Sequence, residues 1–395
     1  MSKVVIGLSG GVDSSVAAHL LKEQGHDVTA LFMINWHDTT GVLTGDCPWD
    51  NDLVFAQMVA KKLNIPFHTV DLSEQYRKKV VDYMFSEYEK GRTPNPDVLC
   101  NREIKFDVFI DEAVKLGAEY VATGHYCRKM SIYKEDKEIY RLLAGKDKNK
   151  DQSYFLCQLS QEQLQRAIFP IGDLQKSEVR EIAKKNKLAS ADKKDSQGIC
   201  FVGKVDLPVF LQQKLAPKKG DIIEIPESFF KSKIDNSELS DENEIKTIAT
   251  QIKYSVKDGI KIGEHNGAHF YTIGQRKGLN VGGKPLPLFI ISTNIQDNII
   301  YVGQGQNHPG LFRKALHIDL KDIHYIREDL KMIPGESKKF SVRHRYRQPL
   351  QEAEIFMKEE GMYIVFEQNQ RGITPGQFAA WYLDDELIGS GTISD

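Results

Sequence analysis

Apolar runs alternate with helical periods through the first third of the chain. Short apolar runs at 4–8, 28–33, 67–72 and 120–124 have the length of buried strands. Between them, 14–24, 52–63, 74–90 and 103–116 repeat apolar residues at helical spacing, and Gly25 and Gly117 stand where two of these helices would stop. This alternation predicts an α/β fold, a doubly wound parallel sheet with helices on both faces.

From about Asp206 the pattern changes to short strands interrupted by prolines. Residues 227–246 are polar and charged, which predicts a loop or excursion. Beyond Pro285, apolar runs at 288–292, 299–302, 339–342, 352–356, 362–366 and 378–382 predict a small antiparallel β-barrel. We therefore expect three domains: 1–205, a small central domain at 206–285 with a polar excursion near 227–250, and a barrel at 286–395.

Composition narrows the possible functions. The 395 residues include 53 Lys and Arg against 55 Asp and Glu, so the net charge is −2, which excludes RNA binding by bulk positive charge and leaves a local patch. No apolar stretch approaches the ~18 residues of a membrane helix, so no membrane partner is expected. The first residues predict a buried strand and not a signal peptide, which favours a cytoplasmic location.

The spacing of the cysteines does not indicate a disulfide scaffold. Five of them, Cys47, Cys100, Cys127, Cys157 and Cys200, are widely spaced and include no C-x-x-C pair. An odd number at such spacing argues against a disulfide framework and against a zinc finger. One or two chemically active thiols remain possible.

A glycine loop follows the first predicted strand and opens the first helix. It consists of Gly7, Leu8, Ser9, Gly10, Gly11, Val12, Asp13 and Ser14. Adjacent glycines let backbone N–H groups approach a phosphate, and the helix adds its positive end. The loop lacks the lysine of a Walker A motif. It resembles the SGG-x-D-S loop of the PP-loop ATP pyrophosphatases, which implies ATP as ligand.

The segment 91–101 combines a stiff loop with a thiol. Two prolines flank Asn95, and Cys100 comes just before a predicted helix for which Asn101 is a plausible N-cap. A helix N-terminus would lower the pKa of the Cys100 thiol, and Asp97 could act as general acid or base. Taken alone, Cys100 fits a small buried hydrophobic residue equally well.

A second candidate thiol lies in the segment 195–201. Gly198 gives the backbone freedom just before Cys200, while Ile199 and Phe201 beside it also fit a buried structural cysteine. The two thiols become informative in combination with the ATP loop. If both line one cleft, one can carry sulfur and the other can resolve it by disulfide or persulfide exchange.

A set of motifs along the chain resembles the tRNA-specific 2-thiouridylases. The motifs are SGGVDSS, GRTPNPDVLCN, ATGHY, KDQSYFL, DSQGICF, TIGQRKGL, RHRYRQ and ITPGQ, in the family's order from residue 9 to about residue 377. The resemblance implies a PP-loop, Rossmann-like domain, a central domain and a tRNA-binding β-barrel. It also implies ATP-dependent replacement of O2 by sulfur on the wobble uridine of tRNA, with a sulfur-relay donor protein as partner.

The resemblance also implies roles for single residues. ATP phosphates would be held by the loop from Gly7 to Ser14, with Met33 and Gly124 contacting the adenosine through the backbone. The target base would be surrounded by Asn95, Pro96 and Asp97; Cys100 would be the nucleophile and Cys200 the persulfide carrier. The anticodon stem-loop of tRNA would be contacted by His125, Lys150, Asp151, Gln152, Arg345, Tyr346 and Gln377. Cys47, Cys127 and Cys157 match no transferred role.

Two further expectations accompany this assignment. Mg²⁺ should accompany the ATP phosphates, and the sequence contains no pattern of a protein metal cage. The stretch Arg343–Arg347 mixes arginine with an aromatic residue and is the best RNA-binding patch, whereas the lysine pairs fit a solvated face.

Other classes of protein also fit part of the pattern. One is a different PP-loop enzyme, such as another RNA thiolase or a synthetase; the other is a nucleotide-dependent RNA-binding protein without chemistry. A glutamine-hydrolysing synthetase needs no paired cysteines, so the two thiols favour thiolation.

Overall fold

The parallel sheet predicted for the first third is present. The computed structural model describes the chain except residues 39, 41–48, 196–197, 204, 231–240 and 395, so Cys47 lies outside the described residues. The sheet has the order β3-β2-β1-β4-β7, with all neighbours parallel. Its strands are β1 (Lys3–Gly7), β2 (Asp27–Ile34), β3 (Phe67–Asp71), β4 (Tyr120–Ala122) and β7 (Ala167–Ile168).

Alternate residues of the central strand face two different cores. Val4 and Ile6 of β1 pack with α1 (Val12–Glu23), α2 (Asp50–Leu63) and α8 (Lys176–Lys185), whereas Val5 packs on the other face. This period of two is the expected consequence of a pleated strand covered on both faces. The doubly wound prediction is therefore confirmed.

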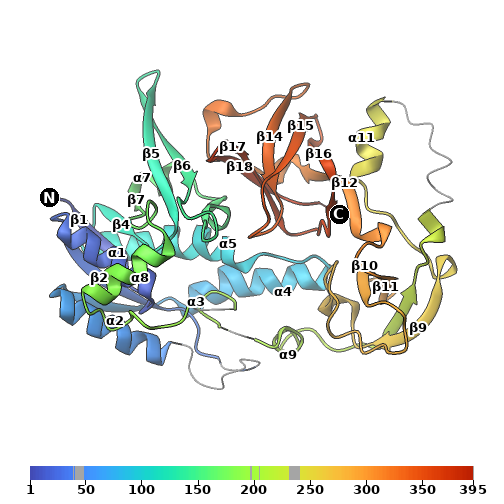
Figure 1. The fold of residues 1–395 in the computed structure, drawn as a ribbon, viewed down its shortest axis with the longest axis horizontal. Helices are drawn as coiled ribbons and strands as arrows, with labels where there is room; N and C mark the ends of the chain where they lie inside the picture. The colour runs from blue at the N-terminus through green and yellow to red at the C-terminus, as the bar shows by residue number, and fades with distance from the viewer. Residues whose placement is uncertain (39, 41–48, 196–197, 204, 231–240, 395) are drawn as a thin grey trace.

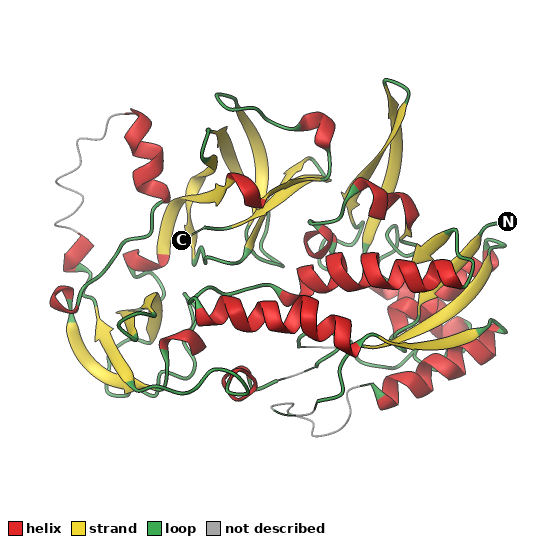
Figure 2. Ribbon diagram, turned by 180° about the vertical axis from the view of Figure 1, so that it is seen from behind, coloured by secondary structure: helices red, strands yellow, loops and turns green. Residues whose placement is uncertain are grey.

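Two long helical segments cover the second face and run across the middle of the molecule (Figure 2). The first is α3 (Ser73–Tyr76), the π-helical η1 (Arg77–Val81) and α4 (Asp82–Glu89). The second is α5 (Pro96–Cys100), the π-helical η2 (Asn101–Val108) and α6 (Phe109–Lys115). Both carry residues of one hydrophobic core that continues beyond the sheet.

The middle of the chain forms a separate four-stranded sheet of order β10-β11-β8-β9. Its strands are β8 (Gly220–Glu224), β9 (Ile260–His265), β10 (Leu288–Asn294) and β11 (Ile299–Gln304). The runs at 288–292 and 299–302 were expected in the barrel, but β11 pairs in parallel with β8. We therefore propose a domain boundary between β11 and β12 (Phe312–Asp319).

The polar region 227–250 is not only a loop. It contains the helix α11 (Asp241–Ala249), which packs against β12 and against β16 (Gly361–Arg371). Ile245, Ile248 and Ala249 cover Ala315 and Tyr363 there, which explains why a mostly polar helix is held in place. The part at 231–240 lies outside the described residues.

The predicted C-terminal antiparallel sheet is also present, with order β12-β16-β15-β14-β17-β18-β6-β5, and β13 pairing with β18. Its further strands are β13 (Ile323–Tyr325), β14 (Ser337–Arg343), β15 (Gln351–Met357), β17 (Phe378–Leu383) and β18 (Glu386–Thr392). The hairpin β5 (Cys127–Lys134) and β6 (Lys137–Ala144) rises from the N-terminal domain and joins this sheet where β6 meets β18 (Figure 1). The first and last parts of the chain are therefore joined by strand pairing.

Short helices complete the described structure. They are η3 (Ser153–Leu156), α7 (Gln161–Arg166), α9 (Leu207–Leu211), η4 (Val256–Asp258), η5 (Ala268–Phe270), η6 (Pro309–Leu311), η7 (Leu320–Asp322) and η8 (Glu328–Leu330). Within the part of the chain that is described, no helix combines the length and apolar character needed to cross a membrane.

Candidate active site

Glycine shapes the loop between β1 and α1. Gly10 has φ of +74°, and a Cβ there would lie 2.1 Å from the carbonyl oxygen of Asp52. Gly11 is the N-cap of α1, and its nearest neighbour to a Cβ among the described atoms would be Ser9 Oγ, at 3.6 Å. Gly11 therefore faces open space at the positive end of a helix, which is the cradle that a phosphate requires.

Serine hydroxyls hold this loop in shape. The Ser9 N–H donates to Ser14 Oγ over 3.2 Å, and the hydroxyls of these two residues lie 3.1 Å apart. Ser15 Oγ donates to Gly11 O over 2.7 Å. The first N–H groups of α1 have no acceptor within the helix, so the fixed loop presents them to a ligand.

The ends of the strands on both sides of β1 converge on the loop. A Cβ on Gly7 would lie 3.6 Å from Met33 Cε, so β2 ends beside the loop. Gly124 follows β4, and a Cβ on it would lie 2.6 Å from Ser14 N. The structure thus brings Met33 and Gly124 to the loop; their contact with adenosine stays a prediction.

The two candidate thiols, which are 100 positions apart, meet. The thiols of Cys100 and Cys200 lie close enough for each to shift the pKa of the other. The backbone N–H of Cys200 donates to Asp97 Oδ1 over 3.0 Å, and Tyr76 Oη donates to the Cys200 carbonyl over 2.7 Å. Asp97, Cys100 and Cys200 therefore form one cluster, which we call the thiol cluster.

The helix that carries Cys100 begins earlier than predicted. Asn95 is the N-cap, since its side chain accepts a hydrogen bond from the Val98 N–H, and Pro96 occupies the first turn. Asn101, predicted as the N-cap, lies inside the helix and donates to the Asp97 carbonyl over 2.9 Å. Cys100 is thus not placed before a helix, and the expected lowering of its pKa by a helix N-terminus is wrong.

Burial and nearby charge shift the pKa values of the two thiols in opposite directions. Burial raises the pKa of the Cys100 thiol well above its usual value, and the nearby Cys200 thiol acts in the same direction. The Cys100 thiol lowers the pKa of Cys200, and Lys105 lowers it further against the effect of burial. Burial also raises the pKa of the Asp97 carboxyl. Cys200 is therefore the more readily ionised thiol.

Lys105 was not predicted from the sequence. Its ammonium lies 5.5 Å from the centre of the Phe201 ring and close enough to Cys200 for each group to shift the pKa of the other. Burial acts to lower the pKa of Lys105, but Cys200, Cys100 and Asp97 raise it above the usual value. In the sequence Lys105 is one cation within an amphipathic helix, so nothing local distinguishes it from a surface lysine.

The residues predicted to contact RNA in the N-terminal domain lie beside the glycine loop. Their side chains already have hydrogen-bond or ion-pair partners within the protein. His125 is buried, with Nδ1 2.8 Å from Thr123 Oγ1, and burial holds its pKa well below the usual value. Asp151 is buried and pairs with Arg343 at 3.1 Å. The Gln152 side chain accepts from the Tyr126 N–H, and Lys150 pairs with Asp195 at 2.7 Å.

Of the three C-terminal candidates, Gln377 contacts the loop at 93–97, whereas Arg345 and Tyr346 have other partners. Gln377 Nε2 donates to the carbonyls of Thr93 and Pro94 over 2.9 and 3.1 Å, and Asn95 Nδ2 donates to Gln377 Oε1 over 3.4 Å. The Tyr346 ring lies 4.1 Å from that of Phe155, and Arg345 donates to the Gly372 carbonyl. The C-terminal sheet thus contributes directly to the surroundings of the predicted base pocket.

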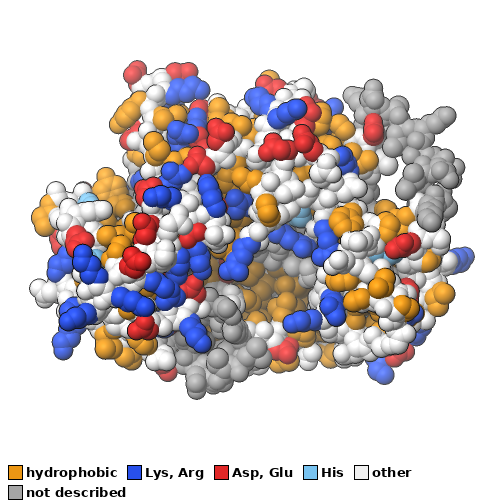
Figure 3. Space-filling view, in the orientation of Figure 1, with side chains coloured by type: hydrophobic (Ala, Val, Ile, Leu, Met, Phe, Trp, Pro, Cys, Tyr) orange, Lys and Arg blue, Asp and Glu red, His pale blue; other side chains and the backbone are white. Residues whose placement is uncertain are grey.

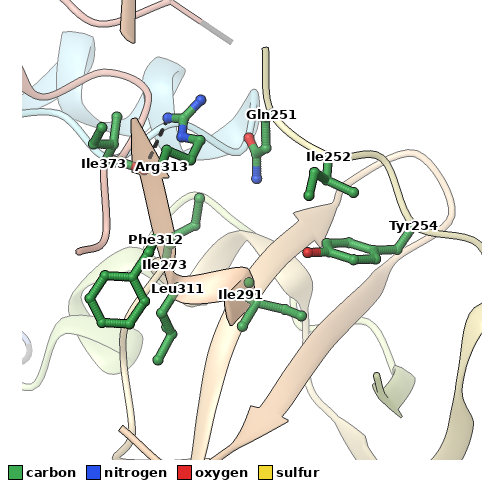
Figure 4. A pocket seen from close by; sticks show the side chains of 10 residues that line it. Gln251, Ile252, Tyr254, Ile273, Ile291, Leu311, Phe312, Arg313 and Ile373 are labelled. Carbon is green, nitrogen blue, oxygen red and sulfur yellow. Dashed lines mark hydrogen bonds between the residues drawn. The ribbon is translucent and has the colours of Figure 1, made fainter. Parts of the chain in front are cut away.

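A small cavity of about 30 Å³ lies elsewhere, between the middle and C-terminal sheets (Figure 4). Its wall is mostly apolar, and Arg313, which points along one side, donates to the carbonyls of Ala249 and Ile373. Neither the glycine loop nor the thiol cluster lines it. The cavity therefore belongs to domain packing and not to the candidate site.

Three family models match the chain. The model described as "tRNA methyl transferase HUP domain" covers residues 2–204, the "tRNA methyl transferase PRC-barrel domain" covers 242–304, and the "Aminomethyltransferase beta-barrel domain" covers 316–393. The gap between the second and third matches contains the boundary that the strand pairing indicates.

Curated relatives match over the full length. Proteins named "tRNA-specific 2-thiouridylase MnmA" from Christiangramia forsetii and Flavobacterium johnsoniae are each 58% identical, with 100% of both chains covered. The protein of that name from Karelsulcia muelleri is 46% identical over 99% of this chain and 98% of its own. Among solved structures, a 4-thiouridine synthetase in complex with RNA and ATP matches at 16% identity and a TM-score of 0.32, over 54% of this chain and 50% of that one.

Proposed function

The chain belongs to the tRNA-specific 2-thiouridylase family, and from this premise we propose that it uses ATP and a cysteine persulfide to replace O2 of the wobble uridine in tRNA by sulfur. The observation that carries the proposal is that the thiols of Cys100 and Cys200 meet beside Asp97. A transfer of sulfur that ends in a disulfide requires two thiols in contact.

ATP supplies the leaving group. An uncharged pyrimidine carbonyl is a poor electrophile, and transfer of AMP to O2 releases pyrophosphate and turns the oxygen into a good leaving group. The cradle at Gly10 and Gly11 and the start of α1 would hold the phosphates. The Asp13 carboxylate would hold Mg²⁺ together with the nucleotide, where the ion would neutralise phosphate charge, since Mg²⁺ with nucleotides needs few protein ligands.

The sulfur step is balanced by the two cysteines. A sulfur-relay donor protein loads Cys200 as a persulfide, and its terminal sulfur attacks C2 of the activated uridine while AMP departs. The Cys100 thiolate then attacks Sγ of Cys200, the bond between the two persulfide sulfurs breaks, and 2-thiouridine is released. The Cys100–Cys200 disulfide that remains holds the two oxidised sulfurs and is reset by an external dithiol reductant.

Asp97 and Lys105 assist the thiols. Lys105 stabilises negative charge on Cys200, which favours the sulfur nucleophile. Asp97 accepts the Cys200 N–H and orients this residue, and its raised pKa suits a carboxyl that accepts the proton when Cys100 ionises. Lys105 is a catalytic residue in this proposal because it contacts the reacting sulfur.

The base enters beside the loop at 93–97. Both ATP and the thiol must reach the uridine, so it has to leave the stack, and a single-stranded anticodon loop makes this inexpensive. Asn95, Pro96 and Asp97 would surround it, with Gln377 completing the wall from the C-terminal sheet.

Positive charge on one face fits the stem of the tRNA. Figure 3 shows Lys and Arg side chains gathered over the N-terminal domain and around a hollow with an apolar floor in the middle of the molecule. We propose that Lys150, Gln152, Arg345 and Tyr346 contact the RNA directly. His125 and Asp151 are buried, so we do not place them in direct contact with the RNA.

Nucleoside mass spectrometry of tRNA tests the proposal. Cells without the protein should lose 2-thiouridine at the wobble position, and Cys100→Ser and Cys200→Ser should each fail to restore it, whereas Cys127→Ala, which alters a buried cysteine outside the thiol cluster, should restore it. Unchanged 2-thiouridine without the protein would refute the assignment. Release of AMP and pyrophosphate with tRNA distinguishes an enzyme from a nucleotide-dependent RNA-binding protein.

A further inference from the structure

A lysine from outside the glycine loop reaches into it. Lys176, the first residue of α8, places its ammonium 2.7 and 2.9 Å from the two carboxylate oxygens of Asp13. The same ammonium lies 2.9 Å from Oδ1 of Asp195, and 13% of the Lys176 side chain is exposed. The loop contains no lysine of its own, so Lys176 brings to the start of α1 the charge that the loop sequence lacks.

Both carboxylates have a second partner. Asp13 also accepts a hydrogen bond from Tyr126 Oη over 2.8 Å. Asp195 is also paired with Lys150 at 2.7 Å and with Arg180 at 3.0 Å. If Lys176 turned toward a ligand, neither carboxylate would be left buried without a partner. The lysine can therefore exchange a carboxylate oxygen for another anion at low cost.

The charges around Lys176 are balanced. Three cations, Lys150, Lys176 and Arg180, meet the carboxylates of Asp13 and Asp195, and Asp147 accepts the Lys176 backbone N–H over 3.0 Å. The positive end of α1 beside this cluster favours an anion. An ammonium on a flexible stem beside such a loop is the arrangement that reaches the outer phosphates of a nucleotide in other phosphate-binding loops.

We propose that Lys176 binds the β- and γ-phosphates of ATP and holds the pyrophosphate as it leaves. This inference rests on the proposed use of ATP. In the other interpretation, Lys176 is a structural bridge that ties α8 to α1 and neutralises Asp13. The two interpretations predict different effects of losing the lysine on ligand affinity. AMP keeps the α-phosphate and lacks the β- and γ-phosphates, so only a phosphate-binding lysine would affect ATP more than AMP.

Titration calorimetry with ATP, pyrophosphate and AMP on the full-length protein separates them. We expect Lys176→Gln to weaken ATP and pyrophosphate binding about tenfold to a hundredfold and to change AMP binding less than about twofold. Lys184→Gln is the matched control, since Lys184 lies on the same helix, is 64% exposed and stands 3.8 Å from Asp192. It should bind all three ligands like the wild type.

One further variant keeps the test decisive. Lys176→Arg keeps the charge and should retain ATP binding within about tenfold even if Lys176→Gln fails to fold. Equal losses for AMP and ATP would overturn the inference. A wild type that binds no ATP would instead refute the proposed function.

Discussion

Gly124 gives the sharpest test of how the fold positions the nucleotide loop. It follows β4, and a Cβ at this position would lie 2.6 Å from Ser14 N, 2.8 Å from the Asp13 carbonyl carbon and 3.0 Å from Ser14 Cα. All three atoms belong to the backbone at the start of α1, so no side-chain rotation can relieve the contact. Gly124→Ala must therefore move either β4 or the loop.

The size of the effect follows from this contact. Ordinary contact begins at 3.4 Å, so the loop must retreat by about 0.8 Å. Overpacking of this kind costs about 1–3 kcal/mol, which lowers the melting temperature of a domain of this size by about 2–4 °C per kcal/mol. Losing one or two N–H hydrogen bonds to phosphate at about 1 kcal/mol each weakens ATP binding about five- to thirtyfold.

Thermal unfolding and ATP titration of the same variant measure both effects. Gly282→Ala is the matched control, because a Cβ there meets nothing within 4 Å among the described atoms. We expect it to melt and to bind ATP like the wild type. If Gly124→Ala also kept both properties, the close approach of Gly124 to the loop would not determine the shape of the ATP site, and the reasoning would fail.

The remaining predictions concern charges. Lys105→Met should raise the pKa of Cys200 and slow its alkylation by iodoacetamide at neutral pH, as mapped by peptide mass spectrometry, and Lys105→Arg should preserve it. Although burial acts to raise the pKa of Asp195, hydrogen bonds from its lysine partners lower it to about 2. A carboxylate with a depressed pKa stabilises the fold above its unfolded pKa, so the melting-temperature deficit of Asp195→Asn should be full at neutral pH and disappear as pH falls from 3.8 to about 2. Arg343→Met should cost about 3–5 kcal/mol in urea unfolding because it removes the ion-pair partner of the buried Asp151 carboxylate, and adding Asp151→Asn should recover part of the loss.

Local sequence patterns were sufficient to predict the elements whose contacts are close in the sequence. The unit β1, loop and α1 depends on a buried run, adjacent glycines and a helical period, and all three are visible in the sequence. The same kind of signal was available for the helix at 96–115, because a residue before proline avoids the helical region and proline suits the first turn. Choosing Asn101 over Asn95 as the N-cap overlooked that rule.

Long-range pairing could not be predicted from local patterns. The runs at β10 and β11 are typical of any half-buried strand, and nothing in them indicates pairing with β8, 75 or more positions earlier. The hairpin of β5 and β6 turns at Glu135 and Asp136, which have φ of +50° and +60°, where such turns usually contain Asn-Gly. Its strands therefore had no turn signal, and its role in joining the first and last domains was missed.

The candidate site also divides into residues that local patterns predict and residues that only long-range contacts bring together. The residues of the glycine loop are contiguous, so their chemistry was predictable, whereas Lys105 and Lys176 act through contacts formed by folding. Cys100 and Cys200 were paired in the prediction by combining two thiols with the ATP loop, and the resemblance to a family gave them their roles; their spacing alone gave neither.

The thiol cluster explains how two identical side chains acquire different tasks. Cys100 is enclosed on a helix and kept neutral by burial, while Cys200 lies beside Lys105 and is the more acidic. A thiol that attacks a sulfur donor must be ionised at neutral pH, which is why our proposal makes Cys200 the carrier. A resolving thiol that ionised early would attack a fresh persulfide on Cys200 before the uridine was in place. The raised pKa of Cys100 delays that attack, so in our proposal the same burial that makes it the weaker nucleophile also protects the sulfur until the RNA arrives.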